Sequence, residues 1–484
     1  MLFNSYIFVL LFLPMCLIGY FTLNHFKKYK LSMLYILFMS LWFYGYFNYS
    51  YLIIIVSSIL FNYIIYHLLN KINTNYKRKI LLILGLTANI GVLLYFKYYD
   101  FFVDNINVVF KTNFNLKHLI LPLGISFFTF QQLSFIIDSY KKEVPKYSLI
   151  DYSCFVTFFP QLIAGPIVTH DELVPQFMDK KKKKFNWDNM SKGIYIFVLG
   201  LAKKVLIADI FGNVVNYGFS NMDLLESTNA IIVMLSYTIQ IYFDFSGYCD
   251  MAIGIGKMMN IDLPLNFDSP YKSFTILEFW KRWHITLTRF FTKYIYIPLG
   301  GSKKGKIRTY LNVMIVFLVS GFWHGANWTF VLWGILHGIF SVITRMFKKT
   351  FENMNSVLNW LITITFINFT WVLFRSNSIK EFLIFVNRIF NLNFQSISPS
   401  IVECFNQIEF TYFLNETSFF KTYPNFLLMC YFVVTIVIIL GSKSAFEKMK
   451  EFKPNFWNAT YTVILLMLCI MSFCGVSTFL YFNF

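Results

Sequence analysis

The chain has 484 residues, of which 57% are apolar and 21% aromatic, whereas only 14% are charged. Soluble domains contain about 25% charged residues, so a soluble protein of this composition would expose more apolar surface than water tolerates. The composition therefore excludes a cytosolic multidomain enzyme, a disordered protein and a secreted scaffold. It predicts an all-α, polytopic membrane helix bundle.

The net charge of +18 would suggest nucleic-acid binding in a soluble domain. In a membrane protein it is better explained by basic cytoplasmic loops that face anionic headgroups, so we expect contact with membrane lipid and none with nucleic acid. The seven cysteines are isolated, without a CxxC pair or histidine-rich ligand spacing. We therefore expect no disulfide framework and no metal site.

Apolar segments long enough, or nearly long enough, to cross a bilayer recur along the chain. The longest, 309–346, contains the polar, glycine-flanked sequence GFWHGAN, and we interpret it as two helices that meet at this break. About eleven or twelve spans result. The segments lie near 5–22, 31–48, 50–69, 80–98, 119–137, 192–215, 229–256, 309–346, 357–374, 424–441 and 457–480.

The basic residues predict the orientation of these spans. With the N-terminus outside and alternating sides, 32 of the 42 Lys and Arg fall in cytoplasmic loops, and the C-terminus also lies outside. The first segment precedes the basic cluster at 27–30 and lacks a small-residue cleavage site. It is therefore read as a retained span and not as a signal peptide.

Two segments differ from plain spans. Residues 152–168 are apolar but are broken by Pro160, Gly165 and Pro166, which predicts a re-entrant segment. Residues 264–301 mix aromatic and cationic side chains, which favours short helices at the cytoplasmic interface. Charged residues also occur inside two apolar segments, and we expect them to pair within the bundle. These are Lys203, Lys204, Asp209, Asp244 and Asp250.

Three of the seven histidines are informative. His324 lies at the polar break, where a buried neutral imidazole is either a proton acceptor or a structural group that joins two helices. His337 is expected to pack between helices. His284 ends the sequence WKRWH, which is either an aromatic and cationic interfacial belt or a mouth that contacts phosphate.

Five long motifs together resemble a known family. The chain is similar to the membrane-bound O-acyltransferases, in the bacterial branch of the alginate O-acetyltransferase membrane subunit, with the D-alanyl transferase of teichoic acid modification as a more distant relative. The resemblance covers nearly the whole chain except 391–423. The motifs are PLGISFFTFQQLSFIID (122–138), FFPQLIAGPIV (158–168), YFDFSGYCDMAIGIGKMMN (242–260), FWKRWHITLTRFFTKYIYIPLGG (279–301) and SGFWHGANWTFVLWGILHG (320–338).

The resemblance implies a fold and a location. It implies a single membrane domain over 1–484, with a catalytic core near 119–346 and peripheral helices at 1–98 and 357–484. The spans would surround a thin central region of short tilted and re-entrant helices, open to a donor on the cytoplasmic side and to an acceptor on the other. A bacterial cytoplasmic (inner) membrane and an extracytoplasmic partner transferase similar to SGNH hydrolases are also implied.

The resemblance further implies catalytic roles for His324 and His284. We expect His324 to act as general base on an acceptor hydroxyl that attacks an acyl thioester, with acetyl-CoA as donor substrate and no tightly bound cofactor. Asn327 or a backbone amide at the break would stabilise the oxyanion, and Trp323, Trp328 and Trp333 would keep the site dry. The residues expected to bind substrate are Trp323, Asn327, Lys281, Arg282, Trp283 and Arg289.

Other interpretations stay open at this point. A transporter or flippase of a lipid-linked sugar also contains broken helices and buried charges, although the sequence shows no inverted repeat. A non-catalytic membrane anchor for an acetylation complex is a third interpretation. The acceptor is an exopolysaccharide, peptidoglycan or teichoic acid. Relatives often have Arg-Asp where this chain has Thr292-Lys293, which affects donor binding, and Tyr481 is either a terminal aromatic anchor or an acyl relay.

Overall fold

The structure is a computed structural model, and it describes residues 1–406, 422–475 and 478–480. This described part is 75% helical and contains no strand, which confirms the all-α prediction. Tyr481 lies outside the described residues, and so does much of the unmatched stretch 391–423. The only helix described within that stretch is the short α20, Pro399–Glu403.

The chain folds into two compact units. The first contains residues 1–197 and 249–265, and the second contains residues 198–248 and 266–484. The boundaries fall inside two helices, α10 (Trp187–Ala202) and α12 (Ser227–Met258), so each helix contributes residues to both units. The single domain expected over 1–484 stays a prediction.

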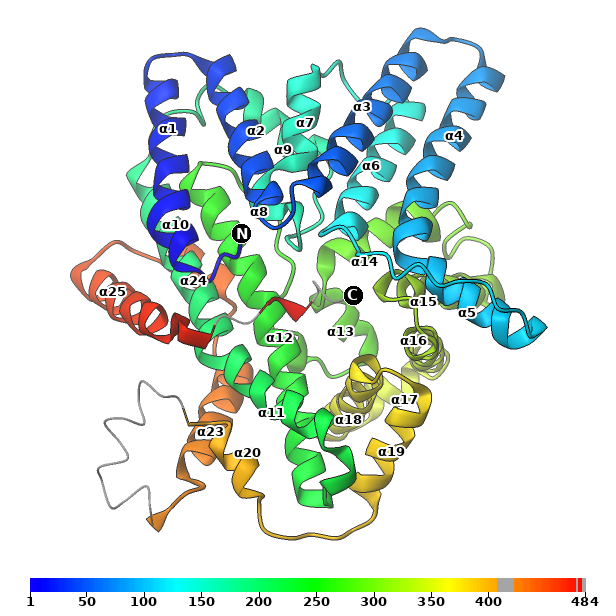
Figure 1. The fold of residues 1–484 in the computed structure, drawn as a ribbon, viewed down its shortest axis with the longest axis vertical. Coiled ribbons are helices and arrows are strands. Elements are labelled where there is room, and N and C mark those ends of the chain that lie inside the picture. Colours follow the sequence, from blue (N-terminus) through cyan, green and yellow to red (C-terminus); the bar gives the residue numbers. More distant parts are fainter. Residues whose placement is uncertain (407–421, 476–477, 481–484) are drawn as a thin grey trace. The chain divides into compact units, whose positions relative to one another are not determined.

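The first unit is built from antiparallel helix pairs joined by short turns. Helices α1 and α2 lie side by side, and so do α3 and α4 (Figure 1), while α6 packs against both α3 and α4. The helices that precede α10 are α1 (Leu13–His25), α2 (Tyr29–Gly45), α3 (Ser50–Lys71), α4 (Asn75–Leu93), α5 (Tyr99–Phe110), α6 (Ile125–Tyr140), α7 (Leu149–Thr157), α8 (Phe159–Leu162) and α9 (His170–Met178).

The broken backbone expected near 152–168 is present. Helix α7 ends at Thr157, and α8 is a single turn that begins directly after the extended Phe158. Every residue from 152 to 168 is buried. The apolar composition of this segment therefore reflects burial within protein, and its re-entrant position in a bilayer stays a prediction.

The second unit contains the short helices and the hairpin that carry the conspicuous histidines. The stretch 264–301 forms two seven-residue helices, α13 (Ile276–Arg282) and α14 (Ile285–Phe291), as its mixed composition predicted. The remaining helices of this unit are α11 (Asp209–Ser220), α15 (Lys306–His324), α16 (Trp328–Met346), α17 (Lys348–Asn353), α18 (Ser356–Arg375), α19 (Ile379–Phe390), α20, α23 (Phe426–Gly441), α24 (Ala445–Glu451) and α25 (Phe456–Met471).

Six helices of the described chain are long and apolar enough to cross a membrane, and the bent pair α23 and α24 would add a seventh. The protein is therefore a multi-pass membrane protein, whose apolar side chains face outward on helices such as α23. The count is below the eleven or twelve predicted segments because several of them form helices of 16 or 17 residues, among them α2, α6 and α25. The six spans are Ile7–His25, Ser50–Lys71, Asn75–Phe110, Ser227–Met258, Trp328–Met346 and Ser356–Arg375.

Three of the charges expected to pair inside the bundle do so in the second unit. The Lys204 ammonium lies 2.6 Å from Asp244 and 2.8 Å from Asp209, and Lys204 and Asp244 are almost fully buried. The backbone N–H of Leu480 also donates to Asp244, at 2.9 Å. This ion cluster fixes the described end of the chain to α12, and Asp250 belongs to the first unit.

Candidate active site

His324 is placed by a tightly packed helical hairpin. The predicted break, 321–327, contains the end of α15 and the loop that leads to α16, and the two helices lie side by side (Figure 1). They pack along a seam of glycines. A Cβ atom on Gly321 would lie 2.4 Å from the carbonyl oxygen of Phe330, and one on Gly334 would lie 2.5 Å from that of Phe317. Only glycine permits this approach, which holds the last turn of α15 firmly against α16.

The His324 imidazole is enclosed by aromatic rings. It ends α15 with 4% of its surface exposed. Its ring centroid lies 4.9 Å from Trp323, 5.1 Å from Trp333 and 5.1 Å from Phe374, each in an edge-to-face arrangement. These edge-to-face contacts orient the ring.

His284 occupies the turn between α13 and α14, where its φ angle is +45°. Asn266 Oδ1 accepts from the backbone N–H of Thr286 at 3.2 Å, so this atom is the amide oxygen. The His284 Nδ1–H therefore donates to the same oxygen, at 3.1 Å. The lone pair is then on Nε2, which is buried and has no hydrogen-bond partner among the described residues.

Burial fixes the charge state of His284. The residue is 1% exposed, and burial lowers the pKa of its imidazole to about 3. Its ring lies 4.8 Å from Phe245 and 6.1 Å from Trp323, and Trp323 also contacts His324. Both histidines that were predicted to be catalytic therefore contact the ring of Trp323. At pH 7, His284 is a neutral hydrogen-bond acceptor.

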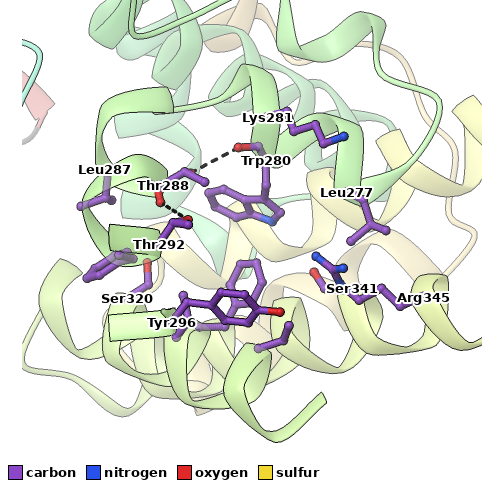
Figure 2. A pocket seen from close by; sticks show the side chains of 14 residues that line it. Leu277, Trp280, Lys281, Leu287, Thr288, Thr292, Tyr296, Ser320, Ser341 and Arg345 are labelled. Carbon is purple, nitrogen blue, oxygen red and sulfur yellow. Dashed lines mark hydrogen bonds between the residues drawn. The ribbon is translucent and has the colours of Figure 1, made fainter. Parts of the chain in front are cut away.

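A cavity of about 390 Å³ lies beside this region (Figure 2). Its walls come from α13, α14, the turn η6 (Thr292–Tyr296), α15 and α16 and are mostly apolar. Ser341 and Arg345 lie on one side, and Ser320 and Thr292 lie on the other. The Ser341 hydroxyl is buried and has no hydrogen-bond partner among the described residues. The lining residues are Leu277, Trp280, Lys281, Leu287, Thr288, Phe291, Thr292, Tyr296, Val313, Val316, Phe317, Ser320, Ser341 and Arg345.

A wider and more polar cavity of about 900 Å³, here called the vestibule, adjoins the first cavity. The two share Leu277, Lys281 and Arg345. Lys306 and Lys348 also line the vestibule. Its two acidic residues face basic partners, since Glu278 pairs with Arg282 and Glu352 with Lys348. The vestibule therefore presents cations at the entrance to an apolar cavity, which suits a ligand with an anionic head and an uncharged arm.

The apolar cavity ends close to His324 without reaching it. Ser320 lines the cavity and precedes His324 by four residues on α15, which is just over one turn, or about 6 Å, along the helix. His324 is not among the lining residues. Trp280 lines the cavity and packs at 5.7 Å against Trp333, whose ring contacts His324.

Two of the residues expected to bind substrate lie at the site. Lys281 lines both cavities, and Trp323 contacts both histidines. Asn327 instead caps α16, because its Oδ1 accepts from Thr329 N–H and its amide donates to Asn377 O at 2.6 Å. An oxyanion would have to use the second amide hydrogen of Asn327, so this role stays a prediction.

The other three residues expected to bind substrate do not line either cavity, and their binding roles stay predictions. Arg282 is paired with Glu278 at 3.0 Å, and Trp283 is 1% exposed and packs at 4.9 Å on Trp371. Arg289 is exposed and absent from the lining of both cavities. Trp328 is 53% exposed, and its expected role in keeping the site dry stays a prediction.

Sequence reasoning missed Arg345, Ser341 and Ser320 as cavity residues. Arg345 and Ser341 are four residues apart and therefore share one face of α16. That spacing is visible in the sequence, but the neighbour of this face is not. No group of three or more His, Cys, Asp or Glu in the described part of the chain is arranged to hold a metal ion.

Comparison of the sequence with known proteins identifies the family of the chain. Residues 137–384 match the model of the MBOAT, membrane-bound O-acyltransferase family. The chain is 41% identical to the peptidoglycan O-acetyltransferase of Helicobacter pylori over 100% of this chain and 98% of that one. It is 38% identical to the probable alginate O-acetylase AlgI of Pseudomonas aeruginosa, over 78% and 73% of the two chains.

A more distant similarity is to another kind of acyltransferase. The chain is 30% identical to the teichoic acid D-alanyltransferase of Streptococcus thermophilus, over 48% of this chain and 59% of that one. The motifs around His284 and His324 both lie inside the matched family region. The multi-pass helical fold, the histidine pair and the full-length similarity together show that the chain belongs to the membrane-bound O-acyltransferase family and is an O-acyltransferase.

Proposed function

We propose that this protein transfers an acetyl group from a thioester donor to an acceptor hydroxyl, as one step in the O-acetylation of peptidoglycan. The observation that supports it best is the apolar cavity with a cationic entrance, which ends one helical turn from His324. The choice of peptidoglycan follows the relative that matches over the full length and is named a peptidoglycan O-acetyltransferase.

The donor is proposed to enter through the vestibule. Lys281 and Arg345 lie where the two cavities meet, so they would hold the phosphates of acetyl-CoA or of a phosphopantetheine carrier. The uncharged pantetheine arm would fill the apolar cavity. The Ser341 hydroxyl, buried four residues before Arg345, is suited to hydrogen-bond an amide of that arm.

His324 is the proposed general base. In its neutral form it takes the proton of the acceptor hydroxyl while the hydroxyl oxygen bonds to the thioester carbon. The carbon–sulfur bond then breaks, and the thiolate leaves with the proton returned by the imidazolium. The neutral Nε2 of His284 is suited to accept a hydrogen bond from a second donor group of the acceptor substrate, such as a neighbouring hydroxyl, and so to orient the reacting one.

Trp333 is the proposed donor to the oxyanion of the tetrahedral intermediate. Its indole ring contacts His324, and its N–H is fully buried without a hydrogen-bond partner among the described residues. A buried donor without a partner is costly, which favours a role that appears only when substrate is bound.

The side of the membrane that the vestibule faces is proposed from the positions of the basic loops. The vestibule is lined by residues of 274–310 and 344–359, which include the loops expected on the cytoplasmic side. The donor would therefore come from the cytoplasm of a bacterium, across its inner membrane, with both termini outside. An extracytoplasmic transferase similar to SGNH hydrolases would pass the acetyl group on to the glycan.

The test is an acetyl-transfer assay with His324→Ala. Membranes that contain equal amounts of wild-type or variant protein receive radiolabelled acetyl thioester, and both free thiol and labelled glycan are measured. We expect transfer to fall by about a hundred- to ten-thousand-fold. His118→Ala is the matched control, because the side chain of His118 is 80% exposed. Transfer by His324→Ala at the wild-type rate, or no thiol release by the wild type, contradicts the proposal, and the second result favours a transporter.

A further inference from the structure

Trp280 forms the part of the cavity wall that is turned toward the histidines. It is the second residue of the FWKRWH sequence, is 8% exposed, and projects its indole among the lining side chains (Figure 2). Behind it, Trp333 makes an edge contact at 5.7 Å and itself contacts His324 at 5.1 Å. Trp280 and Trp333 therefore connect the cavity to the proposed base.

A directed chain of hydrogen bonds holds this indole. The Trp280 N–H donates to His337 Nδ1 at 3.3 Å, so Nδ1 carries the lone pair and the proton of the neutral ring is on Nε2. That Nε2–H donates to the hydroxyl of Thr370 at 3.1 Å. The Thr370 hydroxyl in turn donates to a backbone carbonyl of α18, that of Phe366 or Ile367, at 3.0 Å.

Packing alone does not require a histidine at this position. His337 is completely buried, and its ring lies 4.6 Å from Trp333, 5.0 Å from Phe366 and 6.2 Å from Phe317. A phenylalanine would supply the same ring contacts without burying two polar nitrogen atoms. What the imidazole adds is an acceptor aimed at the Trp280 N–H, which fixes the rotation of that indole within the cavity wall.

We propose that His337 and Thr370 are positioning residues that lock Trp280 as the inner wall of the donor cavity. This inference rests on the proposed function. The locked indole sets the depth at which the thioester stops beside His324, and it keeps water out of the cavity. If the indole rotates, the thioester carbon is misplaced and water gains access, so transfer slows and hydrolysis of the donor rises relative to transfer.

Substitutions of Thr370 test this inference with a matched pair. Thr370→Val keeps the shape of the side chain but removes the acceptor for His337, whereas Thr370→Ser keeps the hydroxyl. We expect Thr370→Val to lower kcat about tenfold, the effect of one buried hydrogen bond, and to raise the ratio of thiol release to acetyl transfer. KM for the donor should stay close to the wild-type value, because Lys281 and Arg345 are unchanged. Thr370→Ser should behave as the wild type.

Trp280→Phe supplies a second, independent variant. It removes the indole N–H and keeps an aromatic ring, so it should reproduce the lower kcat and the higher hydrolysis ratio. Combined with Thr370→Val, it should have no further effect, because both changes break the same chain of hydrogen bonds. This variant carries the test if Thr370→Val does not accumulate in the membrane.

The outcomes separate this inference from the proposed function. If Thr370→Val and Thr370→Ser have the same kcat and the same ratio of thiol release to acetyl transfer, at matched amounts of folded protein, the proposal that His337 and Thr370 position Trp280 is overturned. A fully additive double variant, or Trp280→Phe with wild-type kcat and ratio, would also overturn it. A wild-type protein that releases no thiol from an acetyl thioester would instead remove the proposed function.

Discussion

Replacing Gly321 with alanine should displace His324, although the added methyl group contacts α16 and not the histidine itself. The added Cβ would lie 2.4 Å from the carbonyl oxygen of Phe330, whereas real Cβ contacts are essentially never shorter than 3.0 Å. The blocking atom belongs to the backbone of α16 and has no rotamer by which to move away. Helices α15 and α16 must therefore separate by at least the missing 0.6 Å at this point.

This displacement allows a rough magnitude for the effect on catalysis. His324 follows Gly321 by three residues, so the imidazole moves with the same turn of α15. A misplacement of about 1 Å can cost a factor of about 100 in rate, so a shift of this size should lower kcat by about tenfold. The overpacked seam should also lower the free energy of unfolding by about 1–3 kcal/mol.

Gly338→Ala is the matched control on the same seam. Its added Cβ would meet the Met314 sulfur at 2.8 Å, and this contact is with the far end of a flexible side chain. Methionine can change rotamer, so kcat should stay within about twofold of the wild-type value. The assay is acetyl transfer at saturating donor, normalised to folded protein. A Gly321→Ala enzyme with wild-type kcat would refute the claim that glycine packing places the base.

Three further predictions concern other parts of the molecule. Trp333→Phe should lower kcat by about a hundredfold in the transfer assay if its N–H binds the oxyanion, with little change in the donor KM. Lys204→Met removes the ammonium group that faces the buried Asp244 and the partly buried Asp209, so it should lower the free energy of unfolding by about 3–5 kcal/mol. Adding Asp244→Asn should recover part of this loss in a double-mutant cycle. For Asp262, burial raises the carboxyl pKa, but hydrogen bonds and charge from two lysines lower it by more, to a net value below 3.8. Its stabilisation is therefore present above pH 3.8 and lost as the pH falls through the lowered pKa, so in acid melting curves Asp262→Asn should lose less stability than the wild type.

The sequence was sufficient to predict the parts of the site that depend on local pattern. The polar break 321–327 correctly predicted that 309–346 forms two helices, because glycine and asparagine interrupt an otherwise apolar segment there, and α15 ends inside this break. The aromatic and cationic stretch before His284 correctly predicted short helices. Local rules also offered a signal that was not used, since Glu278 precedes Arg282 by four residues, the spacing of a helical ion pair.

The contacts that were missed depend on residues far apart in the chain. Asn266 orients His284 from 18 residues away, and the bond forms only because His284 adopts a positive φ angle that few non-glycine residues adopt. Thr370 reaches His337 from a separate helix, 33 residues later. Periodicity identifies the buried face of a helix but not the element that covers it, so the partners of these histidines were not predictable from the sequence.

The group that faces His284 Nδ1 is an amide oxygen and not a carboxylate, and this has a functional consequence. A carboxylate in place of the Asn266 amide would also accept the Nδ1–H bond, but it would stabilise the imidazolium and raise the pKa of the ring. The amide oxygen fixes the tautomer without that stabilisation, and burial lowers the pKa to about 3, so Nε2 keeps its lone pair at every physiological pH. His284 is therefore suited to accept a hydrogen bond from a substrate group other than the reacting hydroxyl, and His324 stays the proposed base.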